Sequence, residues 1–242
     1  MKKYKSHIIT ILLFAVVIFL YGFASERSAK KKMQKIDVVF ENGENLFITY
    51  EMVNKLLIQN LENQENQSVE SLLLNKLEMA VESNPMIQNA EVFYTLQGHL
   101  GAIITQKTPV LRVVNESESF YLDVFGKKMP LSGNYSSRVP IISNLDIKDA
   151  EGDLTLLANK IKNDPFLQKQ IIGIKQKKGE IKQFELYTRV GGQTIVLGSM
   201  HNFEKKKSKL KAFYQDAIAN HILEKYDTIN LSFDNQIVCS KK

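Results

Sequence analysis

The chain of 242 residues has no tryptophan, one cysteine, four histidines and only five prolines. The single cysteine, Cys239, excludes an intramolecular disulfide framework and any zinc site that needs two thiolates from this chain. Twelve glycines and five prolines are too few for a collagen-like or mostly disordered chain. The length and a hydrophobic content of 44% suit one or two folded domains.

Excess basic charge is confined to the N-terminus. Residues 1–35 hold eight Lys and Arg and one acid, whereas residues 36–242 hold 24 Lys and Arg and 25 acids. This distribution disfavours a general nucleic-acid-binding face. One later lysine cluster lies on a predicted helix that already has an apolar face, so we interpret it as a solvated polar face. Its members are Lys205, Lys206, Lys207, Lys209 and Lys211.

One long uncharged run is present at residues 8–24 (IITILLFAVVIFLYGFA). A helix of these 17 residues spans about 25 Å, the short end of a hydrocarbon core. We therefore predict a single transmembrane helix at 8–24, after a cytoplasmic tail at 1–7 and before a basic linker at 25–35. Gly22 and Ala24 keep a cleaved signal peptide as the alternative. By the positive-inside rule alone, the basic linker would place the C-terminal part in the cytoplasm.

Residues 36–107 are predicted to form a small domain in the order strand, helix, helix, strand, strand. Apolar residues alternate at 36–40, and Thr49 has the residue type of an N-cap for a helix that runs to about Leu61. A second helix begins at Ser68 and ends before Pro85. Two alternating segments flank Gln97-Gly98 as a hairpin. The order predicts three strands covered on one face by two helices.

Residues 108–242 are dominated by predicted strands, with flanking helices. A helix at 154–163 stops before Asp164-Pro165, and apolar residues at helical spacing predict another at 203–221. A final strand at 228–233 turns at Asp234-Asn235 into residues 236–239. Earlier strands are predicted at 110–114, 120–124, 139–143, 171–174, 183–189 and 194–197. The predicted fold class is therefore α+β.

The sequence offers no constellation for chemistry. No two histidines have the spacing of helical metal ligands, and no Gly-rich phosphate loop is present. Two Ser-x-x-Lys motifs, at 28–31 and 208–211, lack the partner motifs of penicillin-binding enzymes. We therefore predict no catalytic residue, no metal and no cofactor.

Several short motifs follow one another in a specific order. They are residues 84–92 (NPMIQNAEV), 103–113 (IITQKTPVLRV), 121–126 (YLDVFG), 139–142 (VPII) and 229–233 (INLSF). Together with the order of the elements, they resemble the bacterial cell-division family FtsQ/DivIB over nearly the whole chain. Asn230 and Ser232 stand where that family usually has Asp and Arg, which puts a salt bridge there in doubt.

The resemblance implies a POTRA domain at 36–107 and a β domain at 108–242, both outside the cytoplasm, in a bitopic inner-membrane protein. The basic linker and the resemblance predict opposite membrane orientations, and we adopt the orientation that the resemblance implies. It further implies a non-enzymatic scaffold at the division site that binds FtsB-like and FtsL-like proteins and links them to septal peptidoglycan synthesis. The alternatives are a POTRA-containing secretion or outer-membrane assembly factor and a secreted cell-wall enzyme.

An exposed sheet edge would suit such binding, because a partner strand can add to it through main-chain hydrogen bonds. The last strand is the candidate, since no later segment of the chain covers it. The predicted partner-binding residues are Ser232, Phe233, Asn235 and Gln236. The alternative is that Phe233 is a core residue and that the edge is only solvated.

Overall fold

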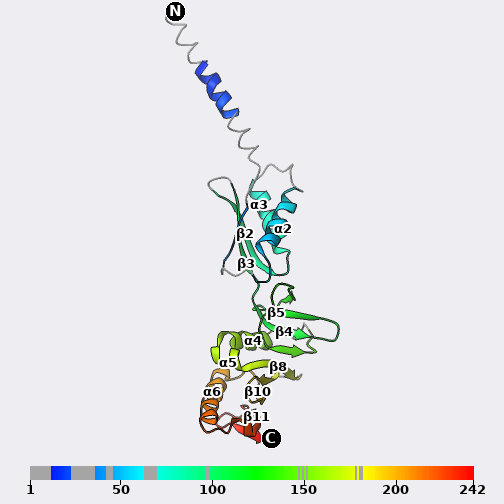
Figure 1. Cartoon of the computed structure of the whole chain (residues 1–242), viewed down its shortest axis with the longest axis vertical. Helices are drawn as coiled ribbons and strands as arrows, with labels where there is room; N and C mark the ends of the chain where they lie inside the picture. The colour runs from blue at the N-terminus through cyan, green and yellow to red at the C-terminus, as the bar shows by residue number, and fades with distance from the viewer. Residues whose placement is uncertain are drawn as a thin grey trace, which may run out of the picture.

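The computed structural model describes residues 12–22, 36–41, 46–62, 70–95, 99–146, 148, 150, 152–177, 179 and 182–242. Residues 12–22 are helical and belong to the predicted membrane segment 8–24, whose other residues lie outside the described ones. Within these ranges, no helix combines the length and the apolar character needed to cross a membrane. The remaining elements form a small and a large unit that follow each other along the long axis of the molecule (Figure 1).

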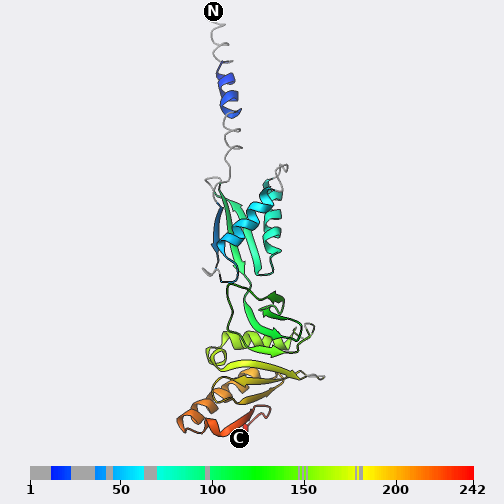
Figure 2. The same cartoon turned by 45° about the vertical axis from the view of Figure 1, so that its right-hand side comes forward.

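The small unit is built on a three-stranded sheet. Its elements are β1 Ile36–Phe40, α2 Tyr50–Glu62, α3 Glu70–Glu82, β2 Ile87–Tyr94 and β3 Leu100–Gln106. Strand β3 is central, parallel to β1 and antiparallel to β2. The predicted order of elements is confirmed, and both helices lie on one face of the sheet (Figure 2).

The first helix of the small unit buries one apolar side and has the predicted N-cap. Val53 and Leu57 are fully buried, and Thr49 Oγ1 accepts the Met52 N–H at 3.4 Å, which confirms the predicted N-cap. Met52 itself is 44% exposed, because it lies about 100° around the helix from Val53. The predicted helix start at Ser68 and the turn at Gln97-Gly98 fall outside the described residues.

The large unit contains a nine-stranded mixed sheet in the order β12-β11-β10-β9-β8-β7-β4-β5-β6. Three neighbouring pairs are parallel, namely β4 with β7, β7 with β8, and β10 with β11. The prediction missed β6, which is too short to show an alternating pattern. The strands are β4 Pro109–Val114, β5 Ser119–Asp123, β6 Lys128–Pro130, β7 Ile141–Ser143, β8 Ile171–Lys177, β9 Gln183–Thr188, β10 Thr194–Gly198, β11 Tyr226–Asn230 and β12 Val238–Lys241.

Helices supply the crossovers of two of the three parallel pairs. Helices α4 Asp153–Asn163 and α5 Pro165–Gln170 connect β7 to β8, while α6 Phe203–Ala219 and the 3-10 turn Leu223–Lys225 connect β10 to β11. Buried residues of α4 and α6 share one core with the strands, so the helices cover one face of the sheet (Figure 2). The predicted helix at 154–163 is confirmed.

Helix α5 was not predicted. The helix before it ends at Asn163 as expected, but Pro165 then starts a new helix. The Asp164 carboxylate accepts the N–H groups of Phe166 and Leu167, both at 3.0 Å, and proline fits the first helical position. Burial alone would raise the pKa of Asp164, but hydrogen bonds from these amides and from Lys207 lower it overall.

The predicted final strand is placed wrongly. Strand β11 ends at Asn230 and β12 begins only at Val238. Asn230 Oδ1 accepts the Ser232 N–H at 2.9 Å, a local turn that competes with continued pairing and directs the chain out of the sheet. Residues 231–237, called the 231–237 connection below, therefore join the two strands.

Phe47 joins the small unit to the large one. Its side chain is 6% exposed and packs with Tyr121 and Met129 of the large sheet. Its ring centroid lies 5.2 Å from that of Tyr135 in an edge-on arrangement. Its N–H donates to Gln106 Oε1 at 2.9 Å, and its carbonyl accepts from Ser132 Oγ at 2.9 Å. Both backbone and side chain of Phe47 thus hold the two units together.

Candidate functional site

The two edges of the large sheet differ in their capacity to pair with another strand. Strand β6 has three residues and ends on Pro130, which has no N–H to donate. Strand β12 has four residues and no proline, and among the described strands it pairs with β11 alone. Because proline, charge and shortness protect sheet edges, β12 is the edge more open to pairing.

The register fixes which backbone groups of β12 face outward. Lys242 donates its N–H to the carbonyl of Lys225 at 3.1 Å, so the backbone of residue 242 faces β11. Backbone groups alternate sides along a strand, and Asn230 pairs with Val238. The N–H and C=O groups of Cys239 and Lys241 therefore face away from β11, toward any added strand.

The four predicted partner-binding residues all lie in the 231–237 connection, next to this edge and not on it. Ser232, Phe233, Asn235 and Gln236 are all exposed. Phe233 is 47% exposed, so the alternative that it belongs to the core is wrong. Val238, at the start of β12, is 42% exposed and adds a second apolar side chain beside it.

Two lysines of α6 donate hydrogen bonds, one to the 231–237 connection and the other to the end of β10. Lys209 Nζ donates to the Phe233 carbonyl at 2.6 Å. Lys206 Nζ donates to the carbonyls of Leu197 and Ser199 at 3.0 and 2.9 Å. These bonds attach the backbone of Phe233 and the end of β10 to α6.

Gly198 allows the connection to lie close to β10. Its φ is +70°, and a Cβ at this position would stand 3.0 Å from Ser232 Oγ. Any other residue would be strained in this backbone conformation and would crowd the Ser232 side chain. The glycine therefore permits the close approach of the connection.

Burial shifts the pKa of two groups at this end of the sheet. Burial lowers the pKa of Lys206, and the nearby Lys209 adds to the effect while Asp234 opposes it. Burial also raises the pKa of the Cys239 thiol, which keeps it protonated and unreactive at neutral pH. Lys206 thus bonds to the backbone at the end of β10, and Cys239 packs against the core of the large unit.

The prediction that the lysines of α6 form a solvated face is wrong for Lys206. Lys206 was assigned to the solvated face, yet its side chain is 7% exposed. Its position carried a signal, because it lies three residues after Phe203 and four before Leu210, both of which are buried. Spacing alone thus places Lys206 on the apolar stripe of the helix.

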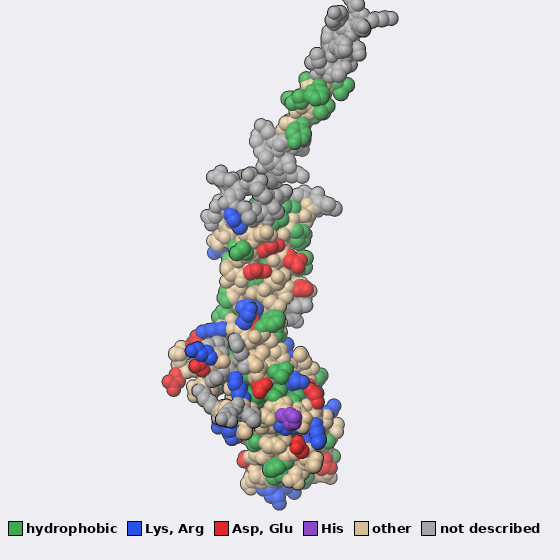
Figure 3. Space-filling model, turned by 180° about the vertical axis from the view of Figure 1, so that it is seen from behind, with side chains coloured by type: hydrophobic (Ala, Val, Ile, Leu, Met, Phe, Trp, Pro, Cys, Tyr) green, Lys and Arg blue, Asp and Glu red, His purple; other side chains and the backbone are tan. Residues whose placement is uncertain are grey.

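Elsewhere the described surface carries mixed charge. On the face shown in Figure 3, acidic side chains gather over the small unit, and both signs are interspersed over the large one. Among the described residues, no three His, Cys, Asp or Glu side chains are arranged to hold a metal ion.

Two family models match the chain, and each covers one of the two units. Residues 108–240 match the family model described as FtsQ/DivIB, C-terminal related, and residues 31–105 match a POTRA-like domain. No curated protein is similar enough to count as a match. Because the first of these models covers more than half of the chain, and a POTRA-like domain precedes it, the chain belongs to the FtsQ/DivIB family of cell-division proteins.

Proposed function

We propose that the chain is a non-enzymatic scaffold for septum formation in the bacterial inner membrane. Residues 8–24 would form its single anchor, with 1–7 in the cytoplasm and the basic linker 25–35, the POTRA domain 36–107 and the β domain 108–242 on the outer side. Family membership supports the division role. The exposed apolar side chains of the helix at 12–22, such as Leu12 at 65% and Phe19 at 72%, support an anchor, since an exposed apolar surface of this kind suits a lipid environment.

The scaffold would act by binding FtsB-like and FtsL-like proteins at the β12 edge. The observation that carries this proposal is the combination of a strand edge without proline and an exposed aromatic ring beside it. A partner strand would bond to the outward N–H and C=O groups of Cys239 and Lys241. Phe233 and Val238 would contact its apolar side chains and set specificity.

The side-chain part of the proposal is tested by co-purification with an FtsB-like partner. Phe233→Asp should weaken binding by at least thirtyfold, because a central aromatic contact in an interface contributes about 2 kcal/mol or more. Phe125→Ala is the matched control, since Phe125 is 61% exposed in the turn between β5 and β6. Circular dichroism should stay native for both variants. Unchanged co-purification of Phe233→Asp would refute the role of this ring.

The backbone part is tested at Lys241. Lys241→Pro removes an N–H that faces outward, so it should cost little stability and yet weaken partner binding. Lys241→Ala removes the same charge but keeps the amide, and it should bind nearly as well as the unchanged chain. Equal loss in both variants would assign the effect to charge and contradict strand addition.

The cellular role is tested by depletion combined with a fluorescent fusion in dividing cells. The proposal expects enrichment at mid-cell and filamentation when the protein is depleted. A uniform envelope signal with normal septation would count against a role in division.

A further inference from the structure

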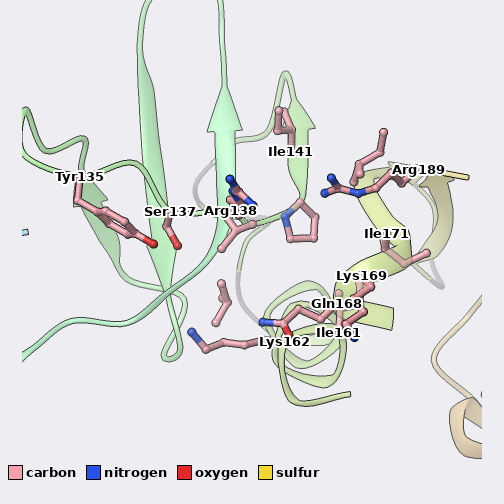
Figure 4. Close-up of a pocket in the computed structure, with 14 residues that line it drawn as sticks. Tyr135, Ser137, Arg138, Ile141, Ile161, Lys162, Gln168, Lys169, Ile171 and Arg189 are labelled. Carbon is pink, nitrogen blue, oxygen red and sulfur yellow. The ribbon is translucent and has the colours of Figure 1, made fainter. Parts of the chain in front are cut away.

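A groove of about 820 Å³ lies in the large unit beside β7 and β8. Figure 4 shows the side chains that line it. The segment before β7 forms one wall, and the ends of α4 and α5 with the start of β8 form the other. In the order of the sheet, five strand spacings of about 4.8 Å separate β7 from β12, or about 24 Å. The groove is therefore a surface separate from the proposed partner edge.

Among the described residues that line the groove, none is acidic and four are basic. They are Arg138, Lys162, Lys169 and Arg189. The guanidinium groups of Arg138 and Arg189 point toward each other from opposite sides of the groove (Figure 4). Within the described part of the chain, neither arginine forms an ion pair. Like charges that converge without a counter-charge repel each other, and an anion placed between them would relieve the repulsion.

Apolar side chains lie alongside the basic ones. They are Val110, Val139, Pro140, Ile141, Ile161, Ile171 and Ile172. Ile141 is 45% and Ile172 is 41% exposed, so apolar surface is left open to a ligand. A smaller hollow of about 190 Å³ shares Tyr135, Ser137 and Lys162 with the groove and adds Lys107. Together they extend the basic trough to the junction of the two units.

We propose that this trough binds an acidic peptide segment of another protein, one in which carboxylate and apolar side chains alternate. Guanidinium groups bind carboxylates in a bidentate manner, and the exposed isoleucines would contact the apolar side chains between them. A phosphate polymer would leave the isoleucines without a partner. A flat membrane surface would not fit a concave trough. The peptide is therefore the ligand class that uses both features.

The test is fluorescence anisotropy with the full-length chain in a non-ionic detergent. The probe is a fluorescein-labelled decapeptide in which Glu alternates with Leu, and the same peptide with Gln in place of Glu is the uncharged control. The Glu peptide should bind, and its affinity should fall at least tenfold between 50 mM and 500 mM salt because exposed charges are screened. The Gln peptide should bind at least tenfold more weakly.

Variants assign the binding to the groove. Arg138→Gln and Arg189→Gln should each weaken the Glu peptide about tenfold, and each Arg→Lys variant should weaken it less, because the charge is kept while the planar fork is lost. Lys211→Gln removes one exposed charge from α6 and should have no effect. Both arginines are exposed, so the unfolding temperature of each variant should stay within about 2 °C of the unchanged chain.

Three results would overturn the proposal. The first is an affinity that the arginine variants leave unchanged. The second is inorganic polyphosphate that binds through the same arginines while the Glu peptide does not. The third is binding of phosphatidylglycerol vesicles through the same arginines while the Glu peptide does not bind. Phe233→Asp should not affect the peptide, so failure here and failure of the β12 edge proposal are distinguishable.

Discussion

Phe47→Ala should uncouple the small unit from the large one without unfolding the large unit. The two units have separate cores that share no residue, and Phe47 belongs to a third cluster with Tyr121 and Met129 between them. Removing a buried phenylalanine costs about 3–5 kcal/mol in a core. We expect the low end, about 3 kcal/mol, because Tyr135 beside it is 38% exposed and can move into the space.

The loss should fall on the small unit, since a domain of about 70 residues buries too little surface to be strongly stable alone. Hydrogen–deuterium exchange followed by mass spectrometry resolves the two units within one sample. In Phe47→Ala, slow amides of β2 and β3 should exchange about a hundredfold faster, the factor that corresponds to about 3 kcal/mol. Amides of β8 and β9 should be unchanged.

Phe125→Ala is the control, because its ring is 61% exposed and its loss should change stability by less than about 0.5 kcal/mol. Phe47→Leu should restore most of the protection in the small unit. Equal acceleration in both units, or none in either, would refute the idea that Phe47 couples two separately folded cores.

Three further predictions concern the large unit. Asp164→Ala should lower the free energy of unfolding by about 1 kcal/mol, because it removes the N-cap of α5. The pKa of Asp164 is lowered from its ordinary 3.8 in the folded state. The contribution of its carboxylate to the free energy of unfolding is therefore complete above pH 3.8 and is lost as the pH falls through the lower folded-state pKa. Urea unfolding at several pH values should show this loss of stability in acid, and Asp164→Asn should abolish it. Lys206→Met should cost about 2 kcal/mol in urea unfolding, since two carbonyls lose their donor, whereas Lys205→Met should cost less than about 0.5 kcal/mol. Lys209→Met should barely change global stability, and hydrogen exchange of the 231–237 connection should become faster because the bond to the Phe233 carbonyl is gone.

Elements with a strong local signal were predictable from the sequence. Apolar residues alternate in the strands of the small unit, and Thr49 and Pro85 lie near the ends of its helices. The order of elements predicted from these signals is confirmed. Helix α6 was predicted from its apolar spacing in the same way. In each case the apolar pattern lies within one short stretch of the sequence.

Features that depend on partners distant in sequence were not predictable. The parallel pairing of β7 with β8 depends on where α4 and α5 pack, and the parallel pairing of β7 with β4 follows a return of the chain past β5 and β6; no local pattern encodes either one. The basic groove brings together Arg138 and Arg189. They are 51 positions apart in the sequence, so the sequence shows no charge cluster that contains both. Only the fold places them opposite each other.

The candidate edge combines both kinds of information. The sequence shows Pro130 and the absence of proline from the last strand. However, the predicted strand at 228–233 runs three residues past the end of β11, and the predicted return at 236–239 begins two residues before β12. The error follows from Asn230, whose side chain bonds to the Ser232 amide and ends β11. The same bond, together with Lys209 on the Phe233 carbonyl, holds an exposed ring beside open backbone groups. A free edge alone would accept many strands, so the fixed position of this ring is what would let the edge select its partner.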